Sequence, residues 1–254
     1  MLKLVNISKV FNGGTVNEKV VFENFNLSVS RGEFVVIIGS NGSGKSTLMN
    51  LIAGKTKPDS GKIRIDGVDV SDKPEHIRAK HIGRVFQDPL MGTAANMRIY
   101  ENLALASKKG RKVGLKWCIS KDDLNSYKEI LKSLNLDLEN SLNSKVGLLS
   151  GGQRQALTLL MATIKRPKVL LLDEHTSALD PKTAKIILAQ TDDIVKKAGL
   201  TTLMITHNLS DAIKFGTRLI MLSSGQVVFD VSGKEKENLT TEDLFKSFSR
   251  LQSY

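Results

Sequence analysis

Cysteine is almost absent from this 254-residue sequence, which contains only Cys118. A single thiol cannot form an internal disulfide, so the class of small disulfide-stabilised secreted domains is excluded. Long apolar runs are also missing: the longest, 34–38 and 169–172, are far shorter than the roughly 18 to 20 residues of a membrane-spanning helix. Residues 1–6 contain no apolar core of signal-peptide length. We therefore expect a chain that does not itself cross a bilayer and that resides in the cytosol.

Aromatic residues that stack on bases are scarce, with three tyrosines and one tryptophan, although the formal net charge is +11. Such a charge favours an anionic partner, whether a nucleotide, a nucleic acid or an acidic membrane face. The densest basic stretch, 108–112 with Lys116 close behind, is interpreted as hydrated surface, with contact to lipid headgroups as the less favoured alternative. No helix-turn-helix, zinc or RNA-binding signature accompanies the charge. We therefore expect no nucleic-acid partner.

Three short apolar runs predict buried parallel strands at 34–38, 169–172 and 203–206. The first leads into a glycine-rich loop and a helix that starts near Lys45 and ends by Gly54. Another helix is predicted between the other two runs, over 181–197. Because strands alternate with helices, the sequence indicates an α/β fold with helices on the faces of a parallel sheet. The length allows one large domain, or a core that carries a smaller inserted subdomain.

The remaining segments predict three further parts. Shorter alternating runs suggest antiparallel strands that flank the parallel sheet, with hairpin turns at Asp66-Gly67 and Ser224-Gly225; these runs are 2–7, 19–29, 62–70 and 218–229. Helical periodicity at 99–106 and 122–134 predicts an inserted helical subdomain over 88–148. The tail restarts as a helix after 234–237, with an apolar stripe that we expect to pack on its own domain rather than on a partner: Leu244, Phe245, Phe248 and Leu251.

The loop after the first strand carries a phosphate-binding pattern of glycines followed by lysine and serine. It comprises Gly39, Ser40, Asn41, Gly42, Ser43, Gly44, Lys45, Ser46 and Thr47. The glycines let backbone N–H groups converge on phosphate oxygens, and the helix that follows adds the positive end of its dipole. Lys45 is expected to reach the β- and γ-phosphates, and Ser46 to ligate Mg²⁺. The strand before the loop and the helix after it argue against a merely structural turn.

Two further features predict anion and metal sites. Asp173 follows a buried strand at the edge where open α/β sheets bind ligands, so we expect it to hold Mg²⁺ through water. The adjacent Glu174 then has another role. Ser150, Gly151 and Gly152 open a predicted helix, and its N–H groups form a second anion site that cannot serve the nucleotide bound at Lys45.

The order of these motifs resembles the ATP-binding subunit of ABC transporters: a phosphate loop, then Leu149-Ser150-Gly151-Gly152-Gln153, then Asp173-Glu174. The resemblance covers nearly the whole chain. It implies a P-loop NTPase (RecA-like) core with an antiparallel β subdomain and an inserted α-helical subdomain, the ABC ATPase architecture. On this basis 1–254 is a single ABC ATPase domain. Residues 1–87 and 149–230 form the core with the β subdomain, 88–148 the helical subdomain and 231–254 a helical tail.

The resemblance also implies catalytic roles in ATP hydrolysis, with ATP and Mg²⁺ as cofactors. Glu174 is the general base that polarises the attacking water. Gln87 contacts Mg²⁺ and that water, and its loop flexes toward the membrane subunit. His207 contacts the γ-phosphate. A purely structural role is the alternative, but the position of His207 directly after a predicted parallel strand favours the phosphate contact. Phe11 lies where the family stacks an aromatic ring on adenine, with core packing as an open alternative.

Partners follow from the same resemblance. Ser150, Gly151, Gly152 and Gln153 would cap the γ-phosphate bound by an opposite subunit, and Asp180, in the loop 177–180, would sense the other site. The active unit is then a head-to-tail dimer of two copies. It would dock on an integral-membrane permease, at the cytoplasmic face of the cell membrane. An extracytoplasmic substrate-binding protein would act through the permease.

His175 departs from the family pattern, because most members have proline after the catalytic glutamate. Together with the segments 92–97, 180–184 and 239–244, it is similar to bacterial importer ATPases paired with branched-chain-type permeases and a substrate-binding lipoprotein, some of them assigned to aromatic amino acids. We therefore expect an importer of a small solute such as an amino acid. Two alternatives stay open: an exporter ATPase, or a soluble ABC ATPase serving assembly or repair. The composition does not separate importer from exporter.

Overall fold

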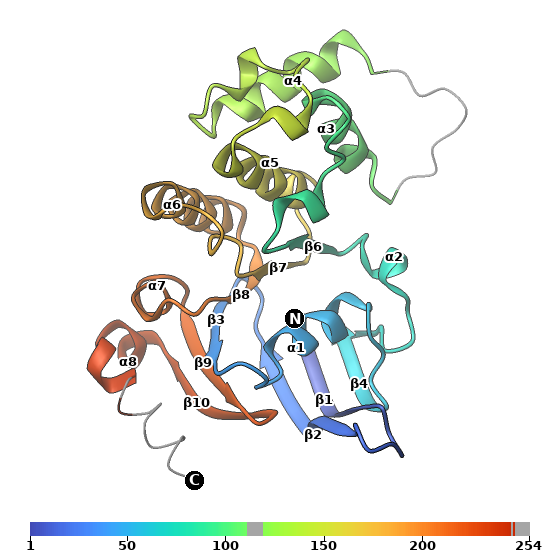
Figure 1. The fold of residues 1–254 in the computed structure, drawn as a ribbon, viewed down its shortest axis with the longest axis vertical. Coiled ribbons are helices and arrows are strands. Elements are labelled where there is room, and N and C mark those ends of the chain that lie inside the picture. Colours follow the sequence, from blue (N-terminus) through green and yellow to red (C-terminus); the bar gives the residue numbers. More distant parts are fainter. Residues whose placement is uncertain (111–118, 245, 247–254) are drawn as a thin grey trace.

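The computed structural model describes residues 1–110, 119–244 and 246, and within them two β-sheets carry helices on their faces (Figure 1). The main sheet has the order β10-β9-β3-β8-β7-β6, and the smaller sheet the order β2-β1-β4-β5. The main-sheet strands are β3 (Phe34–Gly39), β6 (Ile82–Val85), β7 (Val169–Asp173), β8 (Thr201–Ile205), β9 (Arg218–Ser223) and β10 (Gln226–Ser232). The smaller sheet contains β1 (Leu2–Phe11), β2 (Lys19–Val29), β4 (Ser60–Ile65) and β5 (Val68–Asp69).

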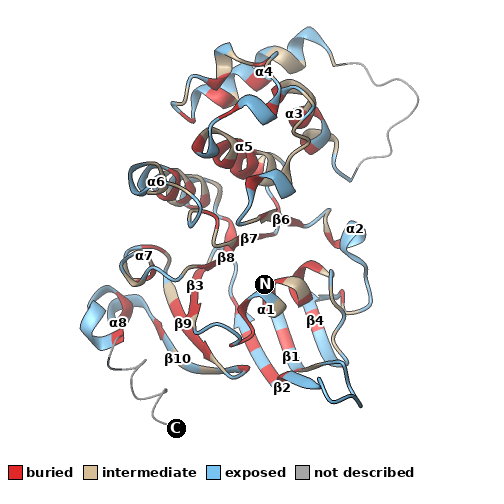
Figure 2. Cartoon of the chain, in the orientation of Figure 1, coloured by how far each residue is buried: buried red, intermediate tan, exposed pale blue. Residues whose placement is uncertain are grey.

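Both faces of the main sheet are buried, which explains why its central strands are continuous apolar runs. In β3, Val35 and Ile37 face a core shared with α1 (Lys45–Ala53) and the smaller sheet. The alternate residues Val36 and Ile38 face a second core. The helices α5 (Gly151–Thr163), α6 (Pro181–Ala198) and α7 (Leu209–Lys214) contribute to that core. Figure 2 shows the contrast between these buried strands and the smaller sheet, where buried and exposed residues alternate.

The predicted parallel strands are confirmed, because β3 pairs in parallel with β8, and β8 with β7. One expectation was wrong for the first part of its run. In 218–229, β9 lies inside the sheet and pairs in parallel with β3, whereas β10 is the expected antiparallel strand at the edge of the sheet. Residues 219–222 are all buried, as in the other central strands, although the hairpin turn after them indicated an antiparallel pair. The prediction also missed β6, whose glycine and arginine interrupt any apolar run.

The smaller sheet is antiparallel, as predicted, with β1 paired to both β2 and β4. The hairpin between β4 and β5 turns at Asp66 and Gly67, whose φ angles are 51° and 78°. Ser224 and Gly225 have φ angles of 45° and 75° in the turn between β9 and β10. Positive φ at both central residues is the requirement of a type I′ hairpin turn, and both predicted hairpins are confirmed.

Residues between β6 and β7 are mainly helical. The helices predicted at 99–106 and 122–134 are α3 (Ile99–Lys108) and α4 (Lys121–Lys132), which pack with α5 around a third core. In the basic stretch, the Lys109 ammonium donates to the carbonyl of Ile82 at 3.2 Å, whereas 111–118 lie outside the described residues. Across the described ranges, we find no helix with the length and apolar content that a membrane span requires.

The C-terminal part of the chain begins with α8 (Gly233–Glu237). Of the predicted apolar stripe, Leu244 is fully buried in the second core, against its own chain. Phe245, Phe248 and Leu251 lie outside the described residues. The remaining short helix, α2 (Glu75–Arg78), precedes β6, and Arg78 caps the end of α1 through the carbonyls of Leu51 and Ile52.

The parallel register brings the loops that follow the strands to one edge of the main sheet. Asp173, at the end of β7, is paired with Ile205, at the end of β8, and Ile205 with Ile37 of β3. The same edge receives the chain after β6. The carboxyl edge of a parallel sheet is where open α/β folds bind ligands.

Candidate functional site

The loop between β3 and α1 is wound tightly against its surroundings. Gly39 and Gly44 have φ angles of 152° and 106°. A Cβ at Gly39 would overlap the carbonyl oxygen of Leu222, and one at Gly44 would lie 2.8 Å from the Phe22 ring. Only glycine fits these two positions. The loop therefore leads directly into the N-terminus of α1 with no side chain at these two glycines, the arrangement that binds phosphate groups.

Two polar groups in this loop have the character of an anion site. The Lys45 ammonium donates to the carbonyls of Gly39 and Ser40, both at 2.9 Å, and the side chain is 7% exposed. The hydroxyl of Ser43 is buried and has no hydrogen-bond partner within the described residues. Burial lowers the pKa of Lys45, and the opposing charges of Glu174 and Asp173 raise it. A phosphate placed in the loop would give this buried cation an anionic partner.

A cavity of about 330 Å³ opens beside the loop. Its walls come from the end of β1, the start of β2, the loop, the first turn of α1 and the residue after β7. They are Phe11, Lys19, Val21, Asn41, Gly42, Gly44, Lys45, Ser46, Thr47 and Glu174. Phe11 is 37% exposed in this wall, so the alternative that it packs in the core is wrong. A hollow of this size, with an aromatic ring near its rim and a lysine in its floor, fits a nucleotide.

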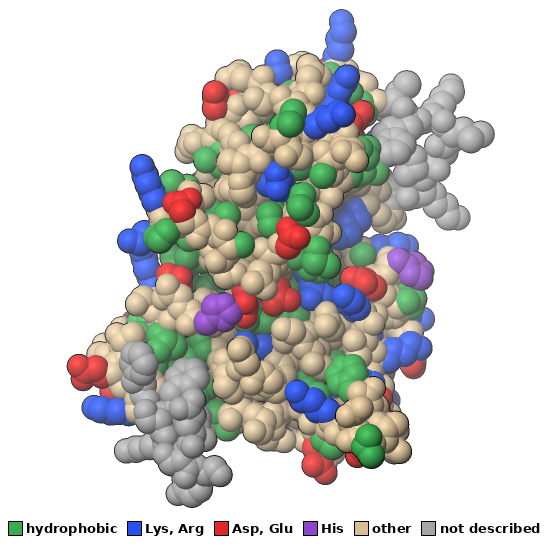
Figure 3. All heavy atoms as spheres, viewed as in Figure 1, with side chains coloured by type: hydrophobic (Ala, Val, Ile, Leu, Met, Phe, Trp, Pro, Cys, Tyr) green, Lys and Arg blue, Asp and Glu red, His purple; other side chains and the backbone are tan. Residues whose placement is uncertain are grey.

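Glu174 follows β7 directly and adopts a strained conformation, with a φ angle of 48°. Its N–H donates to the carbonyl of Ile205 at 3.1 Å, and its own carbonyl accepts from the N–H and the hydroxyl of Ser177. One carboxylate oxygen lies 3.0 Å from Nε2 of His207, which follows β8. The two parallel strands thus bring the predicted base and the predicted γ-phosphate contact together. On the face seen in Figure 3, acidic side chains and a histidine lie beside one another across the middle of the molecule.

A second cavity, of about 430 Å³, lies beyond Ser46, which also belongs to the first. It brings together the three predicted metal-binding residues, Ser46, Gln87 and Asp173. A hydroxyl, an amide and a carboxylate are oxygen donors of the kind that Mg²⁺ prefers. Among the described residues there is no group of three histidine, cysteine or acidic side chains that would hold a metal by itself. The donor set therefore fits a metal that also takes phosphate oxygens as ligands.

The signature segment begins α5 and lies away from the phosphate loop. Ser150 is the N-cap and exchanges hydrogen bonds with Gln153 in a capping box. Gly152 packs so closely on Thr183 that a side chain there would overlap it. Asp180 caps α6 by accepting from the N–H of Thr183 at 3.0 Å, and hydrogen bonding with Thr183 lowers its pKa. Signature and Asp180 are thus neighbours, and neither is among the described residues that line the cavity at Lys45.

His175 anchors the turn after Glu174 to α6. The side chain is 2% exposed, and its Nε2 lies 3.1 Å from the hydroxyl of Thr191. That hydroxyl donates its proton to the carbonyl of Ile187, so it accepts from the imidazole N–H. Burial lowers the pKa of His175 to about 4. A neutral, buried histidine therefore occupies the position where we expected most members of the similar family to have proline.

This burial predicts an acid-sensitive fold. The folded-state pKa of His175 is about 4, against 6.5 ordinarily. The neutral ring therefore stabilises the fold above pH 6.5, and the contribution is lost as the pH falls toward 4. Between pH 7 and pH 5, we expect the free energy of unfolding to fall by about 2 kcal/mol more in the wild type than in His175→Gln. Urea unfolding at both pH values measures the difference, and equal losses in the two proteins would contradict it.

The structure adds residues that the sequence analysis missed. Lys19 lines the first cavity and reaches Gly42, while Asn50 and Arg84 line the second. Arg84 carries no signal that would identify it, because the strand that holds it, β6, lacks an apolar run and was not predicted. Lys19 carries no such signal, because only the pairing of β2 with β1 places it beside the loop.

Comparison with known proteins agrees with this geometry. The family described as ABC transporter matches residues 22–177. The chain is 48% identical, over 98% of both chains, to a tyrosine transport ATP-binding protein of Clostridioides difficile. It is 35% identical to the spermidine/putrescine import ATP-binding protein PotA of Pasteurella multocida, over 86% of this chain and 56% of that protein.

A solved structure matches as well. The dimeric, post-hydrolysis ATP-binding cassette MJ0796, bound to ADP and Pi, superimposes with a TM-score of 0.77. The two chains are 32% identical, and the match covers 91% of this chain and 98% of the MJ0796 chain. The phosphate loop, the signature and the acidic strand end all lie within the region that matches the family. The chain therefore belongs to the ABC transporter family, as an ATP-binding subunit with ATPase activity.

Proposed function

We propose that this chain energises a bacterial importer of a small solute, with an aromatic amino acid as the substrate class. The observation that carries the proposal is the 48% identity to a tyrosine transport ATP-binding protein over 98% of both chains. A second relative, PotA, is an import ATP-binding protein for spermidine and putrescine. The substrate itself would bind to other polypeptides, because the cavities at the strand ends are those of a nucleotide site.

The proposed chemistry starts with ATP in the first cavity. The adenine stacks on Phe11, and the phosphates accept from the loop N–H groups of 39–47 and from Lys45. The lysine then exchanges its two carbonyl partners for phosphate oxygens. Ser46, Asp173 and Gln87 would hold Mg²⁺, which would neutralise negative charge on the phosphates. These contacts position the γ-phosphate beside Glu174.

Hydrolysis then depends on the pair at the strand ends. Glu174 orients the attacking water and takes its proton, because its carboxylate lines the same cavity as Lys45. His207 holds that carboxylate at 3.0 Å and contacts the γ-phosphate. The strained backbone of Glu174, fixed by Ile205 and Ser177, keeps the base in place between turnovers.

The site is completed by a second copy of the chain. We propose that Ser150, Gly151, Gly152 and Gln153 cap the γ-phosphate of the opposite subunit, with Asp180 beside them. Two observations support this head-to-tail arrangement: none of these residues is among the described residues that line the first cavity, and the MJ0796 cassette is dimeric. Closure would move a permease through the loop at Gln87 and the helical segment 88–148, between the core segments 1–87 and 149–230.

Location and remaining partners follow from the same proposal. The subunit would lie at the cytoplasmic face of the cell membrane, held there by the permease. An extracytoplasmic binding protein would deliver the substrate to that permease. The relative from Clostridioides difficile, a transport ATP-binding protein of nearly the same length, supports this arrangement.

Affinity purification tests the proposal. Tagged Glu174→Gln protein, which should hold ATP in a closed dimer, is isolated from gently solubilised native membranes, and mass spectrometry identifies the chains that co-purify. We expect a polytopic permease together with a substrate-binding lipoprotein that binds aromatic amino acids. A permease without a binding protein would indicate an exporter, and soluble partners alone would indicate an assembly or repair ATPase.

A further inference from the structure

The second cavity already contains a cation of its own, the guanidinium of Arg84. Its Nη2 lies 3.1 Å from the carboxylate of Asp173, and its Nη1 donates to the side chain of Asn50 at 2.9 Å. The guanidinium carbon lies 4.7 Å from the centre of the Phe86 ring, adjacent to Gln87. Both side chains of the ion pair are largely buried, with Arg84 10% and Asp173 17% exposed. The carboxylate that is proposed to hold Mg²⁺ is thus already paired with a positive charge.

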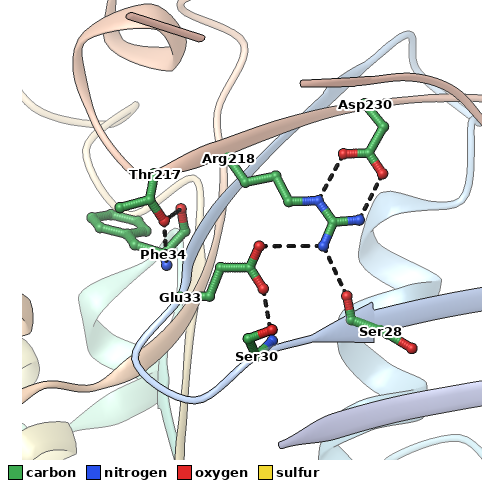
Figure 4. A network of polar contacts seen from close by, with 7 residues as sticks. All are labelled: Ser28, Ser30, Glu33, Phe34, Thr217, Arg218 and Asp230. Atoms are coloured by element: carbon green, nitrogen blue, oxygen red, sulfur yellow. Dashed lines mark hydrogen bonds and ion pairs between the residues drawn. The ribbon is translucent and has the colours of Figure 1, made fainter. Parts of the chain in front are cut away.

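The contact between Arg84 and Asp173 is weaker than a structural ion pair elsewhere in the chain. Arg218 forms a two-pronged contact with Asp230, at 2.7 and 2.6 Å, and also bonds Ser28 and Glu33 (Figure 4). Arg84, by contrast, uses a single nitrogen toward its carboxylate. Its buried Nε has no hydrogen-bond partner within the described part of the chain. Paired, two-pronged contacts are the strong form of this interaction, so Asp173 is held by a contact that another cation can replace.

The other contacts of Arg84 allow that replacement. Asn50 lies on α1 and Phe86 follows β6, and neither contact depends on Asp173. A guanidinium that loses the carboxylate keeps an amide oxygen and an aromatic face, so it is not left buried without partners. The distances place it within the cavity that Ser46, Gln87 and Asp173 line. Loss of the carboxylate would therefore leave the arginine with two of its contacts.

We propose that Arg84 is a positioning residue of the metal site, which holds Asp173 and neutralises it while Mg²⁺ is absent and yields the carboxylate when Mg²⁺ arrives with ATP. This inference rests on the proposed metal site. Without the arginine, Asp173 would lose the cation that pairs with it directly, and only the charges of Lys45 and Lys55 would remain nearby as the phosphates of metal-free ATP approach. Metal-free ATP would then bind more weakly, and Mg²⁺ would gain a carboxylate for which no arginine competes. Arg84 thus sets how strongly nucleotide binding depends on the metal.

A fluorescent, non-hydrolysable ATP analogue measures this dependence without turnover. Its Kd is determined in EDTA and in saturating Mg²⁺. The Kd in EDTA divided by the Kd in Mg²⁺ is the ratio that reports the contribution of the metal. We expect Arg84→Met to raise the ratio by about 5- to 30-fold, because loss of the charge should raise the Kd in EDTA and lower the Kd in Mg²⁺. Arg84→Gln keeps a polar group beside Asn50, removes the charge and should give the same increase. Arg84→Lys restores the charge and should return the ratio to within about twofold of the wild type.

Two controls separate this role from general destabilisation. Arg31→Met removes an exposed arginine that lies 2.8 Å from Asp66, far from the cavities, and should leave the ratio unchanged. In an Asp173→Asn background, Arg84→Met should have no further effect on the ratio, since the carboxylate is gone. Thermal melting identifies any variant that fails to fold, and the comparison then rests on the others.

The outcomes distinguish the two levels of the proposal. A ratio near 1 in the wild type would overturn the metal site itself, and this inference with it. A wild-type ratio well above 1 that is unchanged by both Arg84→Met and Arg84→Gln would leave the metal site standing and overturn the role of Arg84. An equal increase in the Asp173→Asn background would show that the arginine acts elsewhere.

Discussion

Replacing Glu174 by glutamine should slow ATP turnover by roughly 10²- to 10⁴-fold while ATP still binds. The amide keeps the shape of the side chain but cannot take a proton from the attacking water. The residue lies in the same cavity as Lys45, its backbone is fixed by Ile205, and its carboxylate is 3.0 Å from His207. Nothing in these contacts holds the adenine or the ribose, so affinity should survive. Single-turnover hydrolysis and fluorescent-nucleotide binding, measured on the same preparation, check both parts.

A matched control uses Glu235→Gln, which makes the same chemical change on the exposed face of α8, away from the cavities. Its turnover should equal that of the wild type. Turnover of Glu174→Gln within about threefold of the wild type would contradict the base assignment, since a general base contributes far more than that. A stable dimer that forms with ATP in this variant, and not in the wild type, would further support the shared site.

Lys45→Ala should reduce turnover by another route, through weaker binding of ATP and a slower chemical step. The ammonium is the buried cation in the floor of the first cavity, and it exchanges two carbonyl partners for phosphate oxygens when nucleotide enters. Hydrogen bonds to charged groups are worth about 1.5–3 kcal/mol, so affinity for ATP should fall by roughly 10- to 150-fold. Loss of a donor to the developing charge should reduce turnover by a further 10²- to 10³-fold, by analogy with other anion-stabilising donors. Nucleotide titration and saturating-ATP kinetics separate the two effects.

Lys62→Ala is the control, because Lys62 is an exposed lysine of β4 on the smaller sheet. It removes one positive charge without touching a cavity wall, so affinity should stay within about twofold. If Lys45→Ala bound ATP as tightly as this control, the loop would not be the phosphate site. The two variants thus separate binding from chemistry. Glu174→Gln should keep ATP binding and lose hydrolysis, whereas Lys45→Ala should weaken ATP binding as well.

Much of this site was predictable, because its parts are short and local. The glycines of 39–44 are required by backbone conformations that other residues rarely adopt, and that requirement is visible in the spacing alone. The apolar runs at 34–38 and 169–172 are long enough only for strands that are buried on both faces. Capping residues mark where α5 and α6 begin. The roles of the residues came from resemblance to a family rather than from these patterns.

The missed features have a common origin, which is contact between segments distant in the chain. β6 was not predicted, because Gly83 and Arg84 break the apolar pattern that marks a strand, and its pairing with β7 stabilises it instead. β9 was expected to be an antiparallel flanking strand, because its hairpin with β10 is a local signal and its parallel pairing with β3 is not. A hairpin turn determines that the two strands it joins pair in an antiparallel manner, but it does not determine which strand pairs with their other edges.

The sequence by itself determined the phosphate loop, the signature, the acidic strand end and the α/β alternation, since each depends on backbone sterics or burial within a short segment. Only the tertiary structure decided which side chains meet. Arg84 and Asp173 are 89 residues apart, and their contact exists because β6 and β7 pair in parallel. His207 contacts Glu174 because β7 and β8 end together. The physical reason is that strand order and register depend on the packing of the whole sheet, which no local pattern records.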